Sequence, residues 1–123
     1  MILVDTSIWV DHLRGKDKRL AALLNSAMAL THPFVIGELA LGNLRRRALI
    51  LEALRDLPRA TLATDHEVLQ FIDGEGLFGK GIGYVDAHLL ASVRLTAGAS
   101  LWTRNKRLLA AAGRLAMATD PPR

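Results

Sequence analysis

Apolar and polar positions follow two different rhythms along the 123-residue chain. Apolar runs at residues 2–4, 28–31 and 100–103 are too short for helices and predict buried strands. Weaker strand patterns occur at residues 60–63 and 115–118. Longer segments with apolar residues at helical spacing lie between these runs. Because strands alternate with helices, the pattern predicts an α/β domain with a mostly parallel sheet of four or five strands.

The helical segments carry start and stop signals. Pro33 suits the first turn of a helix, Gly15 can end one, and Thr64 followed by Glu67 has the spacing of a capping box. Residues 74–83 contain five glycines, fit neither GxGxxG nor the P-loop pattern, and are expected to be irregular. The expected helices cover residues 8–13, 16–25, 34–44, 48–57, 64–73, 84–95 and 106–112.

Composition narrows the possible classes. The length suits one domain, so residues 1–123 are expected to form a single unit with a frayed tail at 121–123. Sixteen Lys and Arg against 12 Asp and Glu give a net charge of +4, which permits a nucleic-acid partner. The absence of cysteine excludes disulfides, thiolate zinc sites and a cysteine nucleophile, and fits the cytoplasm. Residues 20–37 lack charge but are interrupted by polar residues, so no membrane association is expected.

Candidate chemistry lies where the predicted strands end, because open α/β sheets bind ligands beyond the carboxyl ends of their strands. Asp5 directly follows the first strand, and Glu38 lies one turn into the helix after the second. Asp86 lies near the start of helix 84–95, and Asn105 comes shortly after the strand at 100–103. Taken singly, each residue is better explained as a helix cap or a solvated helix residue than as part of a site.

The neighbours of Glu38 and Asp86 favour a functional explanation. The segments FVIGELAL and VDAHLLA are almost wholly apolar around the acid, so both carboxylates are expected to be partly desolvated. A divalent metal would compensate several such charges together. Oxygen ligands from Asp and Glu suit Mg²⁺ or Mn²⁺.

Four segments together resemble the PIN domain family: VDTS at residues 4–7, Glu38 in the third helix, YVDA at 84–87 and LWTRNKRL at 101–108. Within that family the whole chain resembles the VapC toxins of bacterial VapBC toxin–antitoxin pairs. The resemblance implies a three-layer α/β/α fold and an endoribonuclease that cleaves RNA with water activated by Mg²⁺ or Mn²⁺. It also implies a homodimer and a VapB-type antitoxin that covers the active site within a larger complex.

The resemblance assigns site residues one by one. Asp5, Glu38 and Asp86 become the catalytic acids and the metal ligands, with Glu38 acting through water or as the base. The supporting residues are Thr6 (or Ser7), Thr103 and Asn105. Asn105 stands where the family often has a fourth Asp. Its amide can still accept a hydrogen bond or offer a neutral carbonyl ligand, but it lacks the charge of Asp. We therefore expect one well-occupied metal in the free protein.

Two surfaces complete these expectations. RNA phosphates are expected to contact Arg104, Lys106 and Arg107, although a solvated helix start explains these residues equally well. Family analogy places part of the antitoxin groove at Leu39, Leu41, Leu44 and the apolar face of helix 48–57.

Two alternative functions remain open. A phosphatase-like hydrolase would use Asp5 as its nucleophile, but such enzymes usually carry a second acid where this chain has Ser7. A PIN-like domain that only binds a partner would explain Asn105 as decay of the site. The three retained acids argue against that second alternative.

Overall fold

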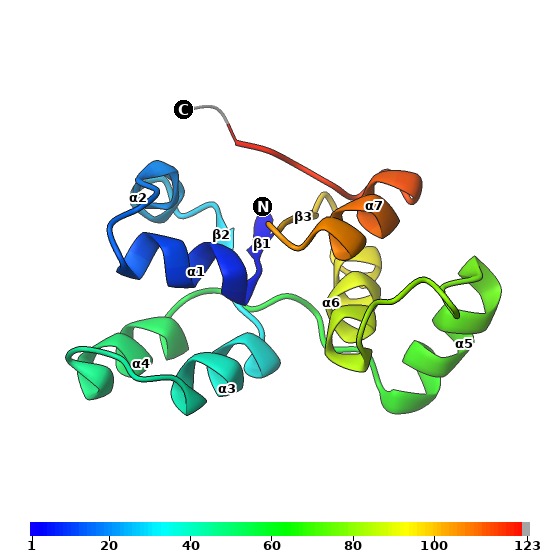
Figure 1. Ribbon diagram of the computed structural model, residues 1–123, viewed down its shortest axis with the longest axis horizontal. Helices are drawn as coiled ribbons and strands as arrows, with labels where there is room; N and C mark the ends of the chain where they lie inside the picture. Colours follow the sequence, from blue (N-terminus) through cyan, green and yellow to red (C-terminus); the bar gives the residue numbers. More distant parts are fainter. Residues whose placement is uncertain (122–123) are drawn as a thin grey trace.

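The computed structural model describes residues 1–121. Its centre is a parallel sheet of three strands in the order β2-β1-β3 (Figure 1). Ile2 pairs with Ala29 and with Ser100, which fixes the register on both sides of the central strand. Because all strands run the same way, their carboxyl ends lie along one edge of the sheet. The strands are β1 (Ile2–Val4), β2 (Ala29–Leu30) and β3 (Ser100–Trp102).

Helices fill the connections between and beyond these strands. The seven helices are α1 (Thr6–Leu13), α2 (Arg19–Asn25), α3 (Pro33–Leu41), α4 (Arg47–Arg55), α5 (Asp65–Glu75), α6 (Tyr84–Leu95) and α7 (Lys106–Arg114). In Figure 1, α1 to α4 lie on one side of the strands and α5 to α7 on the other. This arrangement confirms the expected three-layer α/β/α architecture.

The start signals read from the sequence operate as expected. Pro33 is the first residue of α3, where its missing N–H costs no hydrogen bond. The Thr64 hydroxyl accepts a hydrogen bond from the Glu67 N–H (3.1 Å), and the Glu67 carboxylate accepts one from the Thr64 N–H (2.9 Å). The predicted capping box is therefore confirmed at the start of α5.

The number of strands was overestimated, because the two weaker segments do not form strands within residues 1–121. One parallel bridge forms next to the first segment, between Thr31 and Arg59, and one within the second, between Leu101 and Ala118. Leu62 is 49% exposed, so the segment at 60–63 has little apolar surface to bury against the layer. Ala118 is also exposed. A strand ladder needs a buried face, and these segments provide one at only one or two positions.

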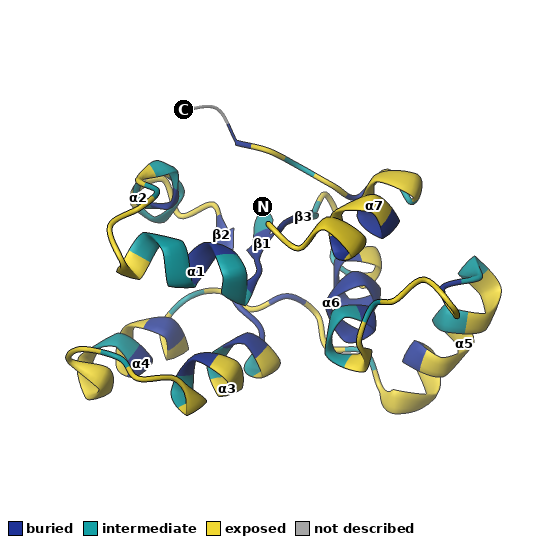
Figure 2. Cartoon of the chain, in the orientation of Figure 1, coloured by how far each residue is buried: buried dark blue, intermediate teal, exposed yellow. Residues whose placement is uncertain are grey.

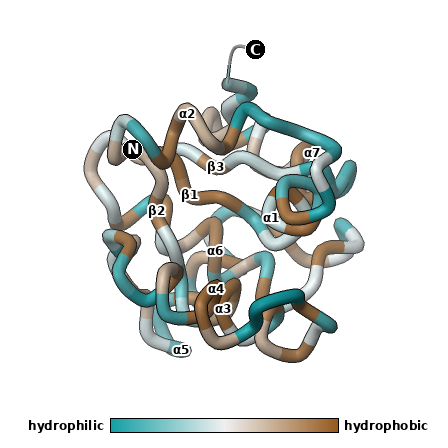
Figure 3. Tube along the Cα trace, turned by 90° about the vertical axis from the view of Figure 1, so that its left-hand side faces the viewer, coloured by the Kyte–Doolittle hydropathy of each residue, from teal (hydrophilic) through white to brown (hydrophobic). Residues whose placement is uncertain are grey.

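The core surrounds the sheet and its flanking helices. Figure 2 shows buried residues on the strands and on the inner sides of α1, α3 and α6. All seven residues from 87 to 93 of α6 are buried, so this helix crosses the interior. Figure 3 shows β1 as an apolar segment between β2 and β3. The first strand is therefore the central strand of the sheet, and Asp5 follows at its carboxyl end.

The end of the chain folds back toward α2. Pro121, expected to belong to a frayed tail, is buried, and its carbonyl accepts a hydrogen bond from Arg19 Nη1 (3.2 Å). Residues 122 and 123 of that expected tail lie outside the described residues. No helix within residues 1–121 is long and apolar enough to cross a bilayer.

Candidate active site

Asp5 lies at the junction of β1 and α1 and is 6% exposed. Its backbone N–H donates to the Trp102 carbonyl (3.0 Å), which continues the pairing of β1 with β3 beyond the last strand residue. Asp5 occupies the N-cap position of α1, yet its side chain makes no capping hydrogen bond. The carboxylate is therefore not explained as a helix cap.

Two hydroxyl groups hold the Asp5 carboxylate. Ser7 Oγ and Thr103 Oγ1 both donate to Asp5 Oδ2, at 2.9 and 2.7 Å. Each hydroxyl also accepts a hydrogen bond from the backbone. The Arg104 N–H donates to Ser7 Oγ (3.1 Å), and the Asn105 N–H donates to Thr103 Oγ1 (3.0 Å). A hydroxyl has one proton to donate. Since each of these hydroxyls accepts a hydrogen bond from the backbone, its own proton is donated to Asp5 Oδ2. Among the described residues, Asp5 Oδ1 accepts no hydrogen bond, which leaves it available to a ligand.

The surroundings of Glu38 differ from those expected from the sequence. The side chain is exposed rather than desolvated, because its apolar sequence neighbours Val35 and Leu39 face the core from another side of α3. Glu38 Oε1 accepts a hydrogen bond from Thr6 Oγ1 (2.7 Å), which links α3 to the first turn of α1. The two candidate hydroxyls thus divide their roles: Thr6 holds Glu38, and Ser7 holds Asp5.

Asp86 lies at the start of α6 and is half-buried. Burial raises the pKa of this carboxyl, the hydrogen bond from the Gly83 N–H to Oδ2 (3.1 Å) lowers it, and the charge of Asp5 raises it again. The bond to Gly83 gives Asp86 part of the capping role considered for it. The influence of Asp5 shows that two acids far apart in the sequence share one electrostatic environment. Such a pair of like charges favours a bound cation.

The acid site has a donor set that fits a hydrated divalent ion. Within residues 1–121, no three His, Asp or Glu side chains lie close enough together to form a closed metal cage. Mg²⁺ does not need such a cage, because it usually keeps several waters and binds through one or two carboxylates. The available donors are carboxylate oxygens of Asp5 and Asp86, with the Ser7 and Thr103 hydroxyls beside Asp5. These residues fit Mg²⁺ or Mn²⁺, with Glu38 at the rim.

Asn105 acts as a helix cap. Its Oδ1 accepts hydrogen bonds from the N–H groups of Arg107 and Leu108, both at 3.1 Å, at the start of α7. A carbonyl oxygen has two lone pairs, and both are used by these bonds. Asn105 therefore has no free carbonyl lone pair to offer a metal, in contrast to the neutral-ligand role considered from the sequence.

The three expected RNA contacts differ in their surroundings. Arg104 forms ion pairs with Asp11 and Asp17. Hydrogen bonds from the Arg19 side chain and backbone lower the pKa of Asp17 to about 2, and Arg104 contributes further to this shift. The charge of Arg104 is thus shared with the protein's own acids.

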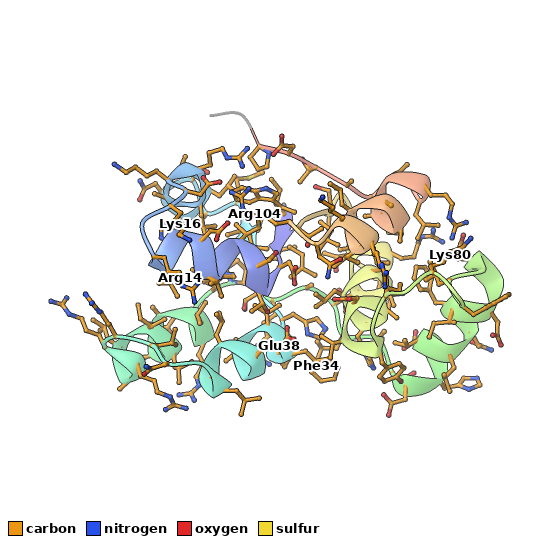
Figure 4. The ribbon with its side chains drawn as sticks, in the orientation of Figure 1. Arg14, Lys16, Phe34, Glu38, Lys80 and Arg104 are labelled. Carbon is orange, nitrogen blue, oxygen red and sulfur yellow. The ribbon has the colours of Figure 1, made fainter. Side chains whose placement is uncertain are left out.

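The other two cations lie on α7. Arg107 packs over Gly81, where an added Cβ would lie 2.6 Å from Arg107 Nη1, while Lys106 is exposed. Figure 4 shows further basic residues on both sides of the site, with Arg14 and Lys16 on the α1 side and Lys80 on the opposite side. No sequence motif marks these three residues.

A cavity of about 580 Å³ starts beside Glu38 and runs between α1, α3 and α4. Thr6 and Glu38 lie among its lining residues, and Arg14 and Arg45 add positive charge to it. Its apolar lining residues are Val10, Leu13, Leu39, Leu44 and Ile50. Of the leucines expected in an antitoxin groove, Leu41 does not line this cavity; its side chain is 90% exposed.

These features define a class: a parallel α/β domain with an acidic, oxygen-lined site at the carboxyl edge of its sheet. The family model of the PIN domain matches residues 2–114. The chain therefore belongs to the PIN domain family.

Curated relatives agree with this assignment. "Ribonuclease VapC32" of Mycobacterium tuberculosis, from strains CDC 1551 / Oshkosh and H37Rv, is 51% identical over 111 residues, which cover 90% of this chain and 90% of the relative. The resemblance to VapC-type PIN-domain toxins read from the sequence is confirmed.

Proposed function

We propose that this protein is the metal-dependent endoribonuclease toxin of a toxin–antitoxin pair. The observation that carries the proposal is the placement of two acids at the carboxyl edge of the sheet: Asp5 is buried at the end of β1, and Asp86 is half-buried at the start of α6, where burial and the charge of Asp5 both raise its pKa. Two findings support it: the chain belongs to the PIN domain family, and its VapC32 relatives are named as ribonucleases. The expected cofactor is Mg²⁺, with Mn²⁺ as an alternative.

The chain's own residues have distinct tasks in this mechanism. When bound by Asp5 and Asp86, a divalent ion supplies positive charge that polarises the scissile phosphate and makes water a stronger nucleophile. Ser7 and Thr103 fix the Asp5 carboxylate so that Oδ1 faces the ligand. Glu38, exposed at the rim, accepts a proton from the attacking water. In-line attack by water leaves a 5′-phosphate and a 3′-hydroxyl.

The partners follow from the same proposal. The apolar cavity beside Glu38 fits a segment of a VapB-type antitoxin, which would cover the acid site while it occupies the groove. Arg14 and Arg45 in the lining would pair with acidic residues of that segment. We further propose a homodimer that joins a larger toxin–antitoxin complex and acts in the cytoplasm, where its RNA substrates are.

RNA cleavage tests the proposal. Wild type, Asp5→Asn and Asp86→Asn would be purified in parallel and incubated with a panel of tRNAs, rRNA fragments and mRNAs, with Mg²⁺, with Mn²⁺ and with EDTA. We expect cleavage by the wild type with either metal, none with EDTA, and a large loss in both variants. Equal cleavage by all three proteins would show a contaminating nuclease and contradict the metal-nuclease proposal.

Two other outcomes identify the alternatives. Antitoxin binding with no cleavage of any RNA would favour a domain that only binds a partner. Hydrolysis of small phosphate esters would favour the phosphatase-like alternative, although Ser7, which stands where such enzymes carry a second acid, donates its hydrogen bond to Asp5.

A further inference from the structure

A partly exposed aromatic ring stands one helical turn from Glu38. Phe34 is the second residue of α3, and its side chain is 38% exposed. Phe34 and Glu38 are four residues apart on one helix, so their side chains share a face. Figure 4 shows the two residues next to each other where α3 approaches α6. The ring is therefore beside the acid site.

Two buried imidazoles hold this ring from the protein side. The Phe34 ring meets His32 edge-on at a centroid distance of 5.2 Å and His88 at 4.7 Å. His32 is 2% exposed and His88 is 4% exposed. The Phe34 N–H donates to His32 Nδ1 (3.0 Å), and His32 Nε2 lies 3.1 Å from Ser92 Oγ. Burial lowers the pKa of His32 to about 4, so this imidazole is neutral at neutral pH.

A second ring lies on the same buried imidazole. Tyr84 is 46% exposed, and its ring meets His88 at a centroid distance of 4.7 Å and an interplanar angle of 89°. Its hydroxyl donates to Asp65 Oδ1 (3.2 Å), which fixes the ring further. Tyr84 comes two residues before Asp86 in the sequence. We call Phe34 and Tyr84 the aromatic ledge.

The ledge has the chemistry of a base-stacking surface. Both rings are partly exposed, and each is held in place by the buried His88 imidazole. Unpaired nucleobases stack on such rings with little dependence on sequence, whereas paired bases have both faces covered by their neighbours. We propose that Phe34 stacks an unpaired nucleobase next to the scissile phosphate, with Tyr84 beside it. This proposal rests on the proposed ribonuclease function.

RNA binding tests the ledge separately from cleavage. The full chain carrying Asp86→Asn, which is expected not to cleave, would be titrated into single-stranded 12-nucleotide RNAs with 2-aminopurine at each position in turn. Stacking quenches 2-aminopurine fluorescence. We expect quenching at one or two positions, a Kd about tenfold higher with Phe34→Leu, and a Kd unchanged or lower with Phe34→Trp. The same RNA in a duplex should bind with no dependence on Phe34.

Phe78 provides the matched control. It is 67% exposed and belongs to the α5–α6 connection, and Phe78→Leu should leave Kd and quenching unchanged. Equal binding and quenching by the parent and Phe34→Leu would overturn the proposal. Should Phe34→Leu unfold by circular dichroism, Phe34→Trp decides, because weaker binding or lost quenching with that variant contradicts stacking.

Two further results separate the ledge from the proposed function. Position-specific quenching that depends on Phe34, without any RNA cleavage by the wild type, would support the ledge and refute the ribonuclease. Cleavage by the wild type with unchanged RNA binding in Phe34→Leu would do the reverse. Weaker antitoxin binding as the sole effect of Phe34→Leu would identify the ledge as a protein contact and overturn the proposal.

Discussion

Asp5 and Glu38, two acids with the same expected class of role, lie in opposite surroundings. Asp5 is buried and is held by two hydroxyls whose protons are directed by backbone N–H groups. Glu38 is exposed and is held by a single hydroxyl from Thr6. One acid is therefore fixed before any ligand binds, and the other can change its position at little cost.

The difference indicates a division of labour. A buried, fixed carboxylate suits a metal ligand, because its geometry is set by the sheet and by the β3–α7 connection. An exposed carboxylate suits proton transfer, because it must reach different partners during a turnover. If this comparison is right, substitutions of the two acids should differ in their effects on the cleavage rate and on the free energy of unfolding.

Asp5→Asn should have the largest effect on cleavage. The amide oxygen can still accept the hydrogen bonds of Ser7 and Thr103, so the fold should persist while the charge is lost. We expect cleavage to fall by about 10³-fold, since the charge supplied through a metal site stabilises the transition state by several kcal/mol. Initial rates measured across Mg²⁺ concentrations check this, with exposed Asp73→Asn as the matched control. A loss below tenfold at every Mg²⁺ concentration would contradict the role of Asp5 as a principal ligand.

Glu38→Gln should have the second largest effect and a different signature. Loss of a general base typically costs about 10²-fold in rate. Because Glu38 is exposed, the free energy of unfolding should change by less than about 0.5 kcal/mol. Rate against pH, together with chemical denaturation, checks both parts. An unchanged pH profile with a weakened affinity for Mg²⁺ would show instead that Glu38 is a metal ligand.

Thr103→Val should have a smaller effect on rate and a larger one on stability. The substitution removes one hydrogen bond to Asp5 and leaves the Asn105 N–H without its acceptor. We expect cleavage to fall by about tenfold and the free energy of unfolding by about 1–2 kcal/mol. Thr103→Ser keeps the hydroxyl and should restore most of both. Equal rates for the valine and serine variants would argue that the fixed geometry of Asp5 is unimportant.

The sequence predicted the place of Asp5 well and the surroundings of Glu38 poorly. A strand-end position in an open α/β sheet is a property of chain order, so Asp5 could be located from the pattern alone. Apolar neighbours in a linear segment do not bury a helical residue, because they point to other faces of the helix. Glu38 therefore looked desolvated in the sequence and is exposed in the fold.

Side-chain partners were harder to predict than positions. The sequence offered Thr6 or Ser7 as the hydroxyl beside Asp5, and their spacing could not decide between them. In the structure the Ser7 hydroxyl donates to Asp5 and the Thr6 hydroxyl donates to Glu38, because the two side chains leave the first turn of α1 in different directions. The cap formed by Asn105 was weighed beside a ligand role, and hydrogen-bond geometry distinguishes them. The catalytic roles of the three acids stay predictions.

The substitution Asp86→Asn should have the smallest effect of these when the measured quantity is the stability of the metal-free protein. Its pKa is raised in the fold, so the native state binds more protons than the unfolded chain, and ionisation of Asp86 weakens the fold as pH rises. In EDTA at pH 7, Asp86→Asn should therefore unfold at a slightly higher temperature than the wild type, because the amide oxygen can still accept the Gly83 N–H. The gain should vanish as pH falls below the ordinary value of 3.8, where the carboxyl is protonated in both states.

Divalent metal should reverse this order. Mg²⁺ stabilises whichever protein binds it in the folded state, so added Mg²⁺ should raise the unfolding temperature of the wild type above that of Asp86→Asn. Thermal unfolding of both proteins at pH 7 and pH 3, with EDTA and with Mg²⁺, gives the comparison. If Mg²⁺ stabilised both equally, Asp86 would not be a ligand. If the variant were less stable in EDTA, the bond from Gly83 to the ionised carboxylate would outweigh the cost of its burial and the repulsion from Asp5, which would contradict a raised pKa for Asp86.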